Sequence, residues 1–181
     1  MNDNNTMYAV RHTNSLKYLA TMDKEILGFI QRVHEYFKKN DQTLSVAESC
    51  TGGLICHYIT ALPGASIFFE AGVVAYSAGA KKNILSISPE TISEFGVVSE
   101  ETAKEMAERI RAITNTDFSL STTGNIGPET LEGKEKGLIY IAVSKHGGVF
   151  TRHIKLTGTR EENKEKASLL ALKFLVETIE I

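Results

Sequence analysis

The sequence predicts an α/β fold, specifically a three-layer α/β/α sandwich over a mixed β-sheet. Segments with helical periodicity alternate along the chain with short apolar segments rich in β-branched residues, which is typical of such folds. One hairpin signal within this alternation indicates a mixed sheet, because a hairpin joins antiparallel strands. The length of 181 residues suits one domain with a full core. We expect a loosely ordered arm over residues 1–20 and a single domain over residues 21–181.

The first half of the domain is expected to alternate helices with strands. From Asp23 onwards, apolar residues recur at the spacing of an amphipathic helix, at Ile26, Ile30, Val33 and Phe37. The elements expected next are a strand over 44–47, a helix over 54–59, a strand over 68–76, a short helix over 80–85 and a further helix that starts at Ser88.

The second half begins with the clearest helix, which starts at Ser99. Glu100 and Glu101 suit the positive end of the helix dipole, and an apolar stripe follows at Ala103, Met106, Ala107 and Ile110. The remaining expected elements are a strand over 117–123, a glycine-rich turn over 124–128, a mobile loop over 129–136, two strands over 137–145 and 149–156 joined by a hairpin, and a final helix over about 160–177.

The composition excludes several classes of function. A formal net charge of −2 gives no basic footprint for nucleic acid and no polybasic patch for a membrane surface, so we expect neither partner. Cys50 and Cys56 are too few for a secreted disulfide scaffold, and the five scattered histidines show no spacing typical of a metal site. The N-terminus lacks the features of a signal peptide. We therefore expect a cytoplasmic protein with reduced cysteines.

The first candidate site is the segment Glu48-Ser49-Cys50-Thr51-Gly52-Gly53, which joins a predicted strand to a predicted helix. Open α/β sheets bind ligands beyond the carboxyl ends of their strands, and helix N-termini present N–H groups to anions. The segment matches neither the phosphate-binding Walker loop nor the serine elbow of α/β-hydrolases. An activated Ser49 would therefore need another base, such as a lysine with a lowered pKa. The same residues also fit ordinary helix capping, and the local pattern does not separate these interpretations.

Three further segments end strands or start helices in the same way. They contain Tyr76 and Lys81, then Thr123 and Gly124, and finally Arg160 in the first turn of the last helix. An arginine there opposes the helix dipole, which favours a carboxylate or phosphate partner. Solvent-exposed lysines, ordinary turn residues and a surface arginine remain the plainer interpretations. Cys50 lacks a paired histidine, which favours a small packing residue over a nucleophile.

Taken together, these segments resemble the CinA C-terminal domain family, whose stand-alone members include nicotinamide-nucleotide amidases. The resemblance covers residues from about 25 to 180 and lies in 47–53, 63–66, 69–77, Lys81, 96–100, 123–124 with 127–128, Gly137 and 158–160. It implies hydrolysis of the carboxamide of nicotinamide mononucleotide to nicotinate mononucleotide and ammonia. It also implies that no metal or other cofactor takes part and that the protein forms a homo-oligomer.

The resemblance also implies roles for individual residues. Ser49 would be the nucleophile and Lys81 its base. Tyr76 would assist proton transfer or position the amide, and Thr123 would complete the catalytic site.

The implied substrate-binding residues are Glu48, Thr51, Gly52, Gly53, Gly124 and Arg160. The N–H groups around Gly52 and Gly53 would bind an oxyanion or the phosphate, and the pattern leaves open which of the two. Arg160 would neutralise the phosphate.

One departure from the family pattern concerns the turn after Gly124. The family usually has a small apolar pair followed by several glycines, whereas this chain has Asn125-Ile126 before Gly127-Pro128 and then a polar stretch. The bulkier turn predicts a narrower pocket or an altered loop over it. A non-catalytic module that binds a nucleotide or partner is therefore the alternative function. A metal-dependent hydrolase is disfavoured by the absence of ligand spacing.

Overall fold

A five-stranded mixed sheet forms the middle layer of the protein. The computed structural model describes residues 22–181, so the arm expected over residues 1–20 lies outside the described residues. The strands lie in the order β2-β1-β3-β4-β5, and their bounds are β1 (Leu44–Glu48), β2 (Phe69–Val74), β3 (Phe118–Gly124), β4 (Leu138–Lys145) and β5 (Gly148–Lys155). β1 is parallel to β2 and β3, whereas β4 is antiparallel to β3 and β5. The predicted mixed sheet is confirmed.

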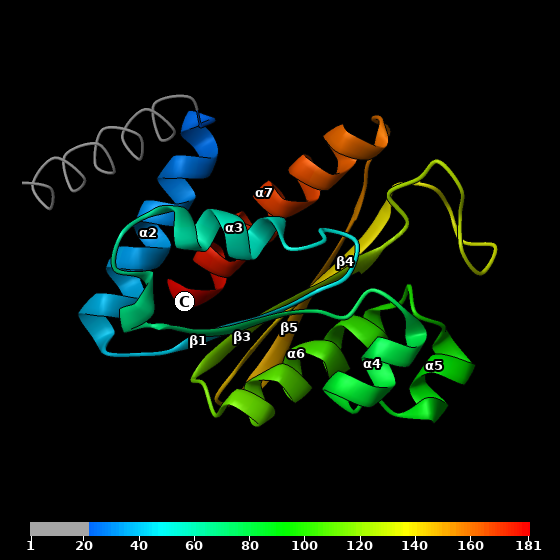
Figure 1. Ribbon diagram of the computed structural model, residues 1–181, viewed down its shortest axis with the longest axis horizontal. Coiled ribbons are helices and arrows are strands. Elements are labelled where there is room, and N and C mark those ends of the chain that lie inside the picture. Colours follow the sequence, from blue (N-terminus) through cyan, green and yellow to red (C-terminus); the bar gives the residue numbers. More distant parts are fainter. Residues whose placement is uncertain (1–21) are drawn as a thin grey trace, which may run out of the picture.

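Helices cover both faces of this sheet (Figure 1). One face carries α2 (Lys24–Asn40), α3 (Leu54–Ala61) and α7 (Arg160–Ile179). The other carries α6 (Glu100–Thr114), which crosses all five strands, with α4 (Ala78–Leu85) and α5 (Pro89–Phe95) packed against it. The predicted three-layer α/β/α sandwich is confirmed. None of the helices within 22–181 is both long and apolar enough to cross a membrane.

The main core lies between the sheet and the α2–α3–α7 layer. The predicted apolar stripe of α2 is buried there, and its last member, Phe37, stacks on Phe68 with ring centroids 5.4 Å apart. Phe118 of β3 meets the same ring edge to face, also at 5.4 Å. Burial of such a side chain stabilises a fold by about 1.5–3 kcal/mol. These contacts fix the start of β3 and the connection into β2.

Two element boundaries differ from the sequence prediction in a way that shapes the site. The strand expected over 68–76 spans only 69–74, because Ser77 caps α4 by accepting the N–H of Ala80 at 3.0 Å. α4 consequently begins at Ala78, two residues before its predicted start. A short 3-10 helix over 65–67, which the sequence did not predict, precedes β2.

The carboxyl ends of β1, β2 and β3 meet at one edge of the sheet. In the ladder Glu48 pairs with Val74 on one side and with Thr122 on the other, so the three strands end at nearly the same level. The chain leaves β1 through α3 on one face and leaves β2 through α4, α5 and α6 on the other. Such a divergence opens a crevice beyond the strand ends, where ligands of α/β proteins bind.

Candidate active site

A cavity of about 290 Å³ lies beyond this edge of the sheet. Six of the ten residues predicted for the site line it, namely Ser49, Tyr76, Lys81, Thr123, Gly124 and Arg160. The rest of the lining consists of Cys50, Val97, Val98 and residues between 125 and 131. The structure therefore brings together the ends of β1, β2 and β3 and the first turns of α4 and α7.

Ser49 and Lys81 form the buried centre of the cavity. Ser49 directly follows β1, and its N–H donates to the carbonyl of Thr122 at 3.0 Å. Lys81 lies on the first turn of α4 with 1% of its surface exposed. Its Nζ donates to Ser49 Oγ at 2.8 Å and to the carbonyl of Ala75 at 2.9 Å. A hydroxyl and an amine are thus within direct proton-transfer distance.

The Lys81 amine has uncharged partners at both of these hydrogen bonds. Burial consequently lowers the pKa of Lys81 from 10.5 to about 8, an effect that the negative charge of Glu132 partly offsets. With a pKa of about 8, roughly a tenth of this lysine is neutral near pH 7. A neutral fraction of this size is sufficient for the amine to act as a general base.

Burial shifts the pKa of Cys50 upwards, in contrast to that of Lys81. Burial raises the pKa of the Cys50 thiol to about 12, so the thiol stays protonated around neutral pH. The side chain is 4% exposed and packs into the main core as well as against the cavity. These features agree with its interpretation as a packing residue next to Ser49.

Glu48 lies next to Ser49 but does not line the cavity. Its carboxylate is fully buried and accepts the N–H groups of Gly53 at 2.9 Å, Ile55 at 3.3 Å and Cys56 at 2.9 Å. These are donors that the start of a helix leaves without a helical partner. The structure does not place Glu48 in the lining of the cavity, where the sequence predicts it, because its carboxylate accepts hydrogen bonds from the first turn of α3.

Thr51, Gly52 and Gly53 also build the turn instead of lining the cavity. Thr51 Oγ1 shares a hydrogen bond of 2.7 Å with Thr122 Oγ1. The N–H of Gly52 donates to the Ser49 carbonyl at 3.1 Å, and the N–H of Gly53 is taken by a carboxylate. Both glycines have positive φ, +58° and +93°, which this tight turn requires. The structure therefore does not present the N–H groups of Gly52 and Gly53 to the cavity, as the sequence predicts, because both already have acceptors in the protein.

Arg160 and Tyr76 form the rim of the cavity. Thr159 and Glu162 cap α7 with a complete capping box, which places Arg160 in the first turn. The Arg160 guanidinium donates to the Tyr76 hydroxyl at 2.8 Å and to the carbonyl of Gly127. Tyr76 is 60% exposed. Because these acceptors carry no charge, the guanidinium charge stays available to an anionic ligand at the rim.

Thr123 and Gly124 form the end of β3. Thr123 is buried, and its Oγ1 donates to the carbonyl of Val97 at 2.6 Å. A Cβ at Gly124 would lie 2.7 Å from the carbonyl oxygen of Leu138 and 2.9 Å from Cα of Ile139. Glycine is therefore required here by the close approach of β4, which gives Gly124 a structural reason for its place in the lining.

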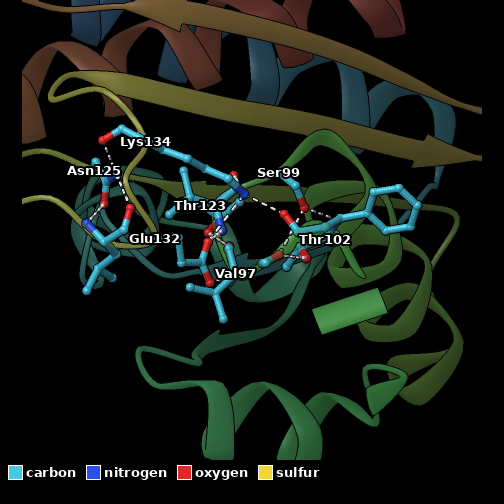
Figure 2. Close-up of polar contacts among 11 residues, drawn as sticks. Val97, Ser99, Thr102, Thr123, Asn125, Glu132 and Lys134 are labelled. Carbon is cyan, nitrogen blue, oxygen red and sulfur yellow. Dashed lines mark hydrogen bonds and ion pairs between the residues drawn. The ribbon is translucent and has the colours of Figure 1, made fainter. Parts of the chain in front are cut away.

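The β3–β4 loop, residues 125–137, closes one side of the cavity. Asn125 exchanges two hydrogen bonds with the backbone of Leu131, at 3.1 and 3.2 Å, and donates to the carbonyl of Lys134 at 3.3 Å. Glu132 reaches across to the turn before α6 (Figure 2). The expected mobile loop is thus bound at several points, and Asn125 organises it from within. The sequence identified this turn as unusual, but its polar composition indicated only a loop.

The fold and the cavity together define an α/β protein with a buried serine–lysine pair at the carboxyl edge of its sheet. Residues 28–179 match the CinA C-terminal domain family, and the chain belongs to this family. One relative is named a competence-damage inducible protein and comes from Thermoanaerobacter pseudethanolicus. It is 44% identical to this chain over 157 residues, which are 86% of this chain and 37% of that protein. A CinA-like protein of Shewanella amazonensis is 39% identical over 139 residues, 76% of this chain and 33% of its own length. The chain thus spans about a third of the length of these relatives.

Solved structures of the family share the fold. The competence damage-inducible protein A of Klebsiella pneumoniae superposes with a TM-score of 0.83 at 30% identity, covering 86% of this chain and 97% of that one. A competence/damage inducible protein of Agrobacterium tumefaciens gives a TM-score of 0.84 at 29% identity, covering 88% and 98%. Similarity at this level extends over nearly the whole described domain.

Proposed function

We propose that the protein is an amidase that hydrolyses the carboxamide of nicotinamide mononucleotide to nicotinate mononucleotide and ammonia. The observation that carries this proposal is the 2.8 Å hydrogen bond between Lys81 Nζ and Ser49 Oγ inside a cavity with an arginine at its rim. The choice of substrate is supported by membership of a family whose stand-alone members include such amidases.

Acylation would begin at Ser49. The neutral Lys81 amine accepts the hydroxyl proton while Ser49 Oγ attacks the carboxamide carbon, which forms the C–O bond and moves the carbonyl π electrons onto oxygen. Cys50 lines the cavity, and its N–H has no backbone or carboxylate acceptor within 22–181, so we assign this N–H to the oxyanion. The Lys81 ammonium then protonates the amide nitrogen. The C–N bond breaks, ammonia departs, and the acyl group remains as an ester on Ser49.

Deacylation would use the same pair in reverse. Lys81, now neutral, accepts a proton from water as the water oxygen attacks the ester carbon. The C–O bond to Ser49 breaks, and Lys81 returns the proton to the serine oxygen. The nicotinate product ionises and carries away its negative charge. Dividing the reaction into two steps makes a poorly reactive amide accessible to a serine nucleophile.

Arg160 would bind the phosphate of the substrate. Its guanidinium already lies at the rim with only neutral protein acceptors, Tyr76 and Gly127. Guanidinium groups pair with phosphate oxygens through two parallel N–H donors, which also orients the nucleotide.

The test is to incubate the purified protein with nicotinamide mononucleotide and to measure ammonia and nicotinate mononucleotide. We expect Ser49→Ala and Lys81→Met to lower turnover by a factor on the order of a thousand or more. Ser93→Ala and Lys82→Met are matched controls on exposed positions and should keep activity. Absence of ammonia from the unaltered protein would refute the proposal, and calorimetric binding without turnover would favour a nucleotide-binding module instead.

We also propose that the protein forms a homo-oligomer. β2 is an edge strand of the described sheet, and Val74 on it and the neighbouring Ile67 are exposed, at 44% and 65%. An exposed edge with apolar side chains is a suitable surface for a second copy. Light scattering on the purified chain tests this, and a monomer at all concentrations would contradict it.

A further inference from the structure

Two side chains of the β3–β4 loop, Glu132 and Lys134, form hydrogen bonds with the backbone of the turn before α6 (Figure 2). The Glu132 carboxylate accepts the N–H groups of Val97 at 2.7 Å and Val98 at 3.3 Å. The Lys134 ammonium donates to the carbonyl oxygens of Val98, at 2.8 Å, and of Phe95. One loop therefore binds both the donors and the acceptors of this turn, and Val97 and Val98 are part of the cavity wall.

Two backbone features favour this contact. Glu132 has a φ of +58°, in the left-handed region that disfavours residues with a Cβ, so its side-chain contacts must outweigh that cost. Gly96 has a φ of +80°, and a Cβ there would lie 2.2 Å from the Glu132 carboxylate. Only glycine allows both the turn and the close approach of the carboxylate.

The backbone of Val97 connects these loop contacts to the candidate active site. Its N–H is bound by Glu132, and its carbonyl accepts the Thr123 hydroxyl at 2.6 Å. A hydroxyl has a single proton, so Thr123 can only accept a hydrogen bond from a molecule in the cavity. A carboxamide offers two N–H donors to such an acceptor, whereas a carboxylate offers none.

We propose that Glu132 is a positioning residue that fixes the Val97 peptide and thereby sets Thr123 to accept a hydrogen bond from a carboxamide. This inference rests on the proposed function, since it concerns how the amide substrate is distinguished from its acid product. The Thr123 oxygen attracts the –NH2 group before hydrolysis and repels the carboxylate oxygen after it. The same contact thus favours binding of the substrate and release of the product.

The test measures binding of nicotinamide mononucleotide and nicotinate mononucleotide by calorimetry in the full chain, with Ser49→Ala preventing turnover. Glu132→Gln keeps the side-chain size but has one acceptor oxygen for the N–H groups of Val97 and Val98, and its –NH2 group is repelled by the other N–H, so the two contacts cannot both form. We expect it to lower the ratio of amide to acid affinity about tenfold. Thr123→Val should lower the ratio at least as much, because it removes the acceptor itself.

Glu135→Gln is the matched control. Glu135 lies in the same loop, is exposed, and pairs with Lys155 on the surface. Its substitution should leave the affinity ratio unchanged. Hydrogen exchange gives a readout that needs no ligand: the N–H groups of Val97 and Val98 should exchange faster in Glu132→Gln and at the unaltered rate in Glu135→Gln.

The outcomes distinguish this inference from the proposed function. If the unaltered protein releases ammonia but Glu132→Gln leaves the affinity ratio or the exchange rates unchanged, the inference is overturned and the amidase stands. If no ammonia is released but the ratio falls as expected, the positioning role stands and the amidase does not. If neither mononucleotide binds, both are overturned. Glu132→Ala serves as the second variant should Glu132→Gln fail to fold.

Discussion

The side-chain amine of Lys81 donates a 2.8 Å hydrogen bond to the hydroxyl of Ser49, although the two residues are 32 positions apart in the chain. The contact exists because β1 and β2 are parallel neighbours, which places Ser49 and the start of α4 at the same edge of the sheet. Burial of the amine without a carboxylate partner lowers its pKa to about 8, which makes a lysine usable as a base.

The activity should therefore depend on pH through Lys81. The amine accepts a proton only when it is neutral, so kcat/KM should rise with pH and level off above about 8, with a slope corresponding to one proton. Initial rates at low concentrations of nicotinamide mononucleotide, measured from about pH 6 to 9, would establish this profile. A profile that is flat over this range would show that Lys81 is not the base.

Arg160 should control affinity for the phosphate. Arg160→Ala should raise KM for nicotinamide mononucleotide about ten- to a hundredfold with a smaller change in kcat, because a charge-assisted contact to a non-reacting group is lost. The corresponding nucleoside, which lacks the phosphate, should be affected far less. Arg109→Ala, on a surface pair with Glu105, is the control. Equal losses for nucleotide and nucleoside would argue against a phosphate contact.

Glu48 should matter for stability and not for substrate affinity. Glu48→Gln replaces two buried acceptor oxygens, which serve three N–H groups, by one oxygen and an –NH2 group that cannot accept from the N–H it faces. We expect a loss of about 2–3 kcal/mol in the free energy of unfolding, measured by urea denaturation. KM for nicotinamide mononucleotide should change little in the folded fraction. A large rise in KM with unchanged stability would restore Glu48 to the binding site.

The sequence was sufficient to predict the fold and most of the residues that line the cavity. Helical periodicity and β-branched segments predict the elements, and the parallel strands explain why Ser49, Tyr76 and Thr123 converge on one cavity. The direction of a single side chain was not predictable in the same way. Glu48 and Ser49 are neighbours, yet one side chain caps α3 and the other faces Lys81.

The wall of the cavity formed by Val97 and Val98 was not predictable for a different reason. It depends on Glu132, which is 35 positions from Val97 and lies in a polar loop without any period. Local sequence patterns predict neither the course of such a loop through space nor the contact of its carboxylate with a turn far away in the sequence. The local sequence offers one indication of this contact, Gly96, whose missing Cβ leaves room for the Glu132 carboxylate.

Stability should also depend on pH through His34 on α2. The ring is 5% exposed, packs edge to face on Phe68, and its Nε2 donates to the carbonyl of Ile59 at 2.8 Å. Burial lowers the pKa of His34 below its ordinary value of 6.5, and the nearby Lys38 lowers it further, although the bond to Ile59 acts in the opposite direction.

Because the folded state disfavours the protonated ring, the free energy of unfolding should be constant above about pH 7 and fall as the pH drops below 6.5. The slope should not exceed about 1.4 kcal/mol per pH unit for this one proton. Urea denaturation at about pH 7.5 and 5.5 measures the difference. His34→Gln keeps a donor for Ile59 and should remove this dependence, whereas His146→Gln, on an exposed turn, should retain it. An equal dependence in all three proteins would show that the decisive proton binds elsewhere.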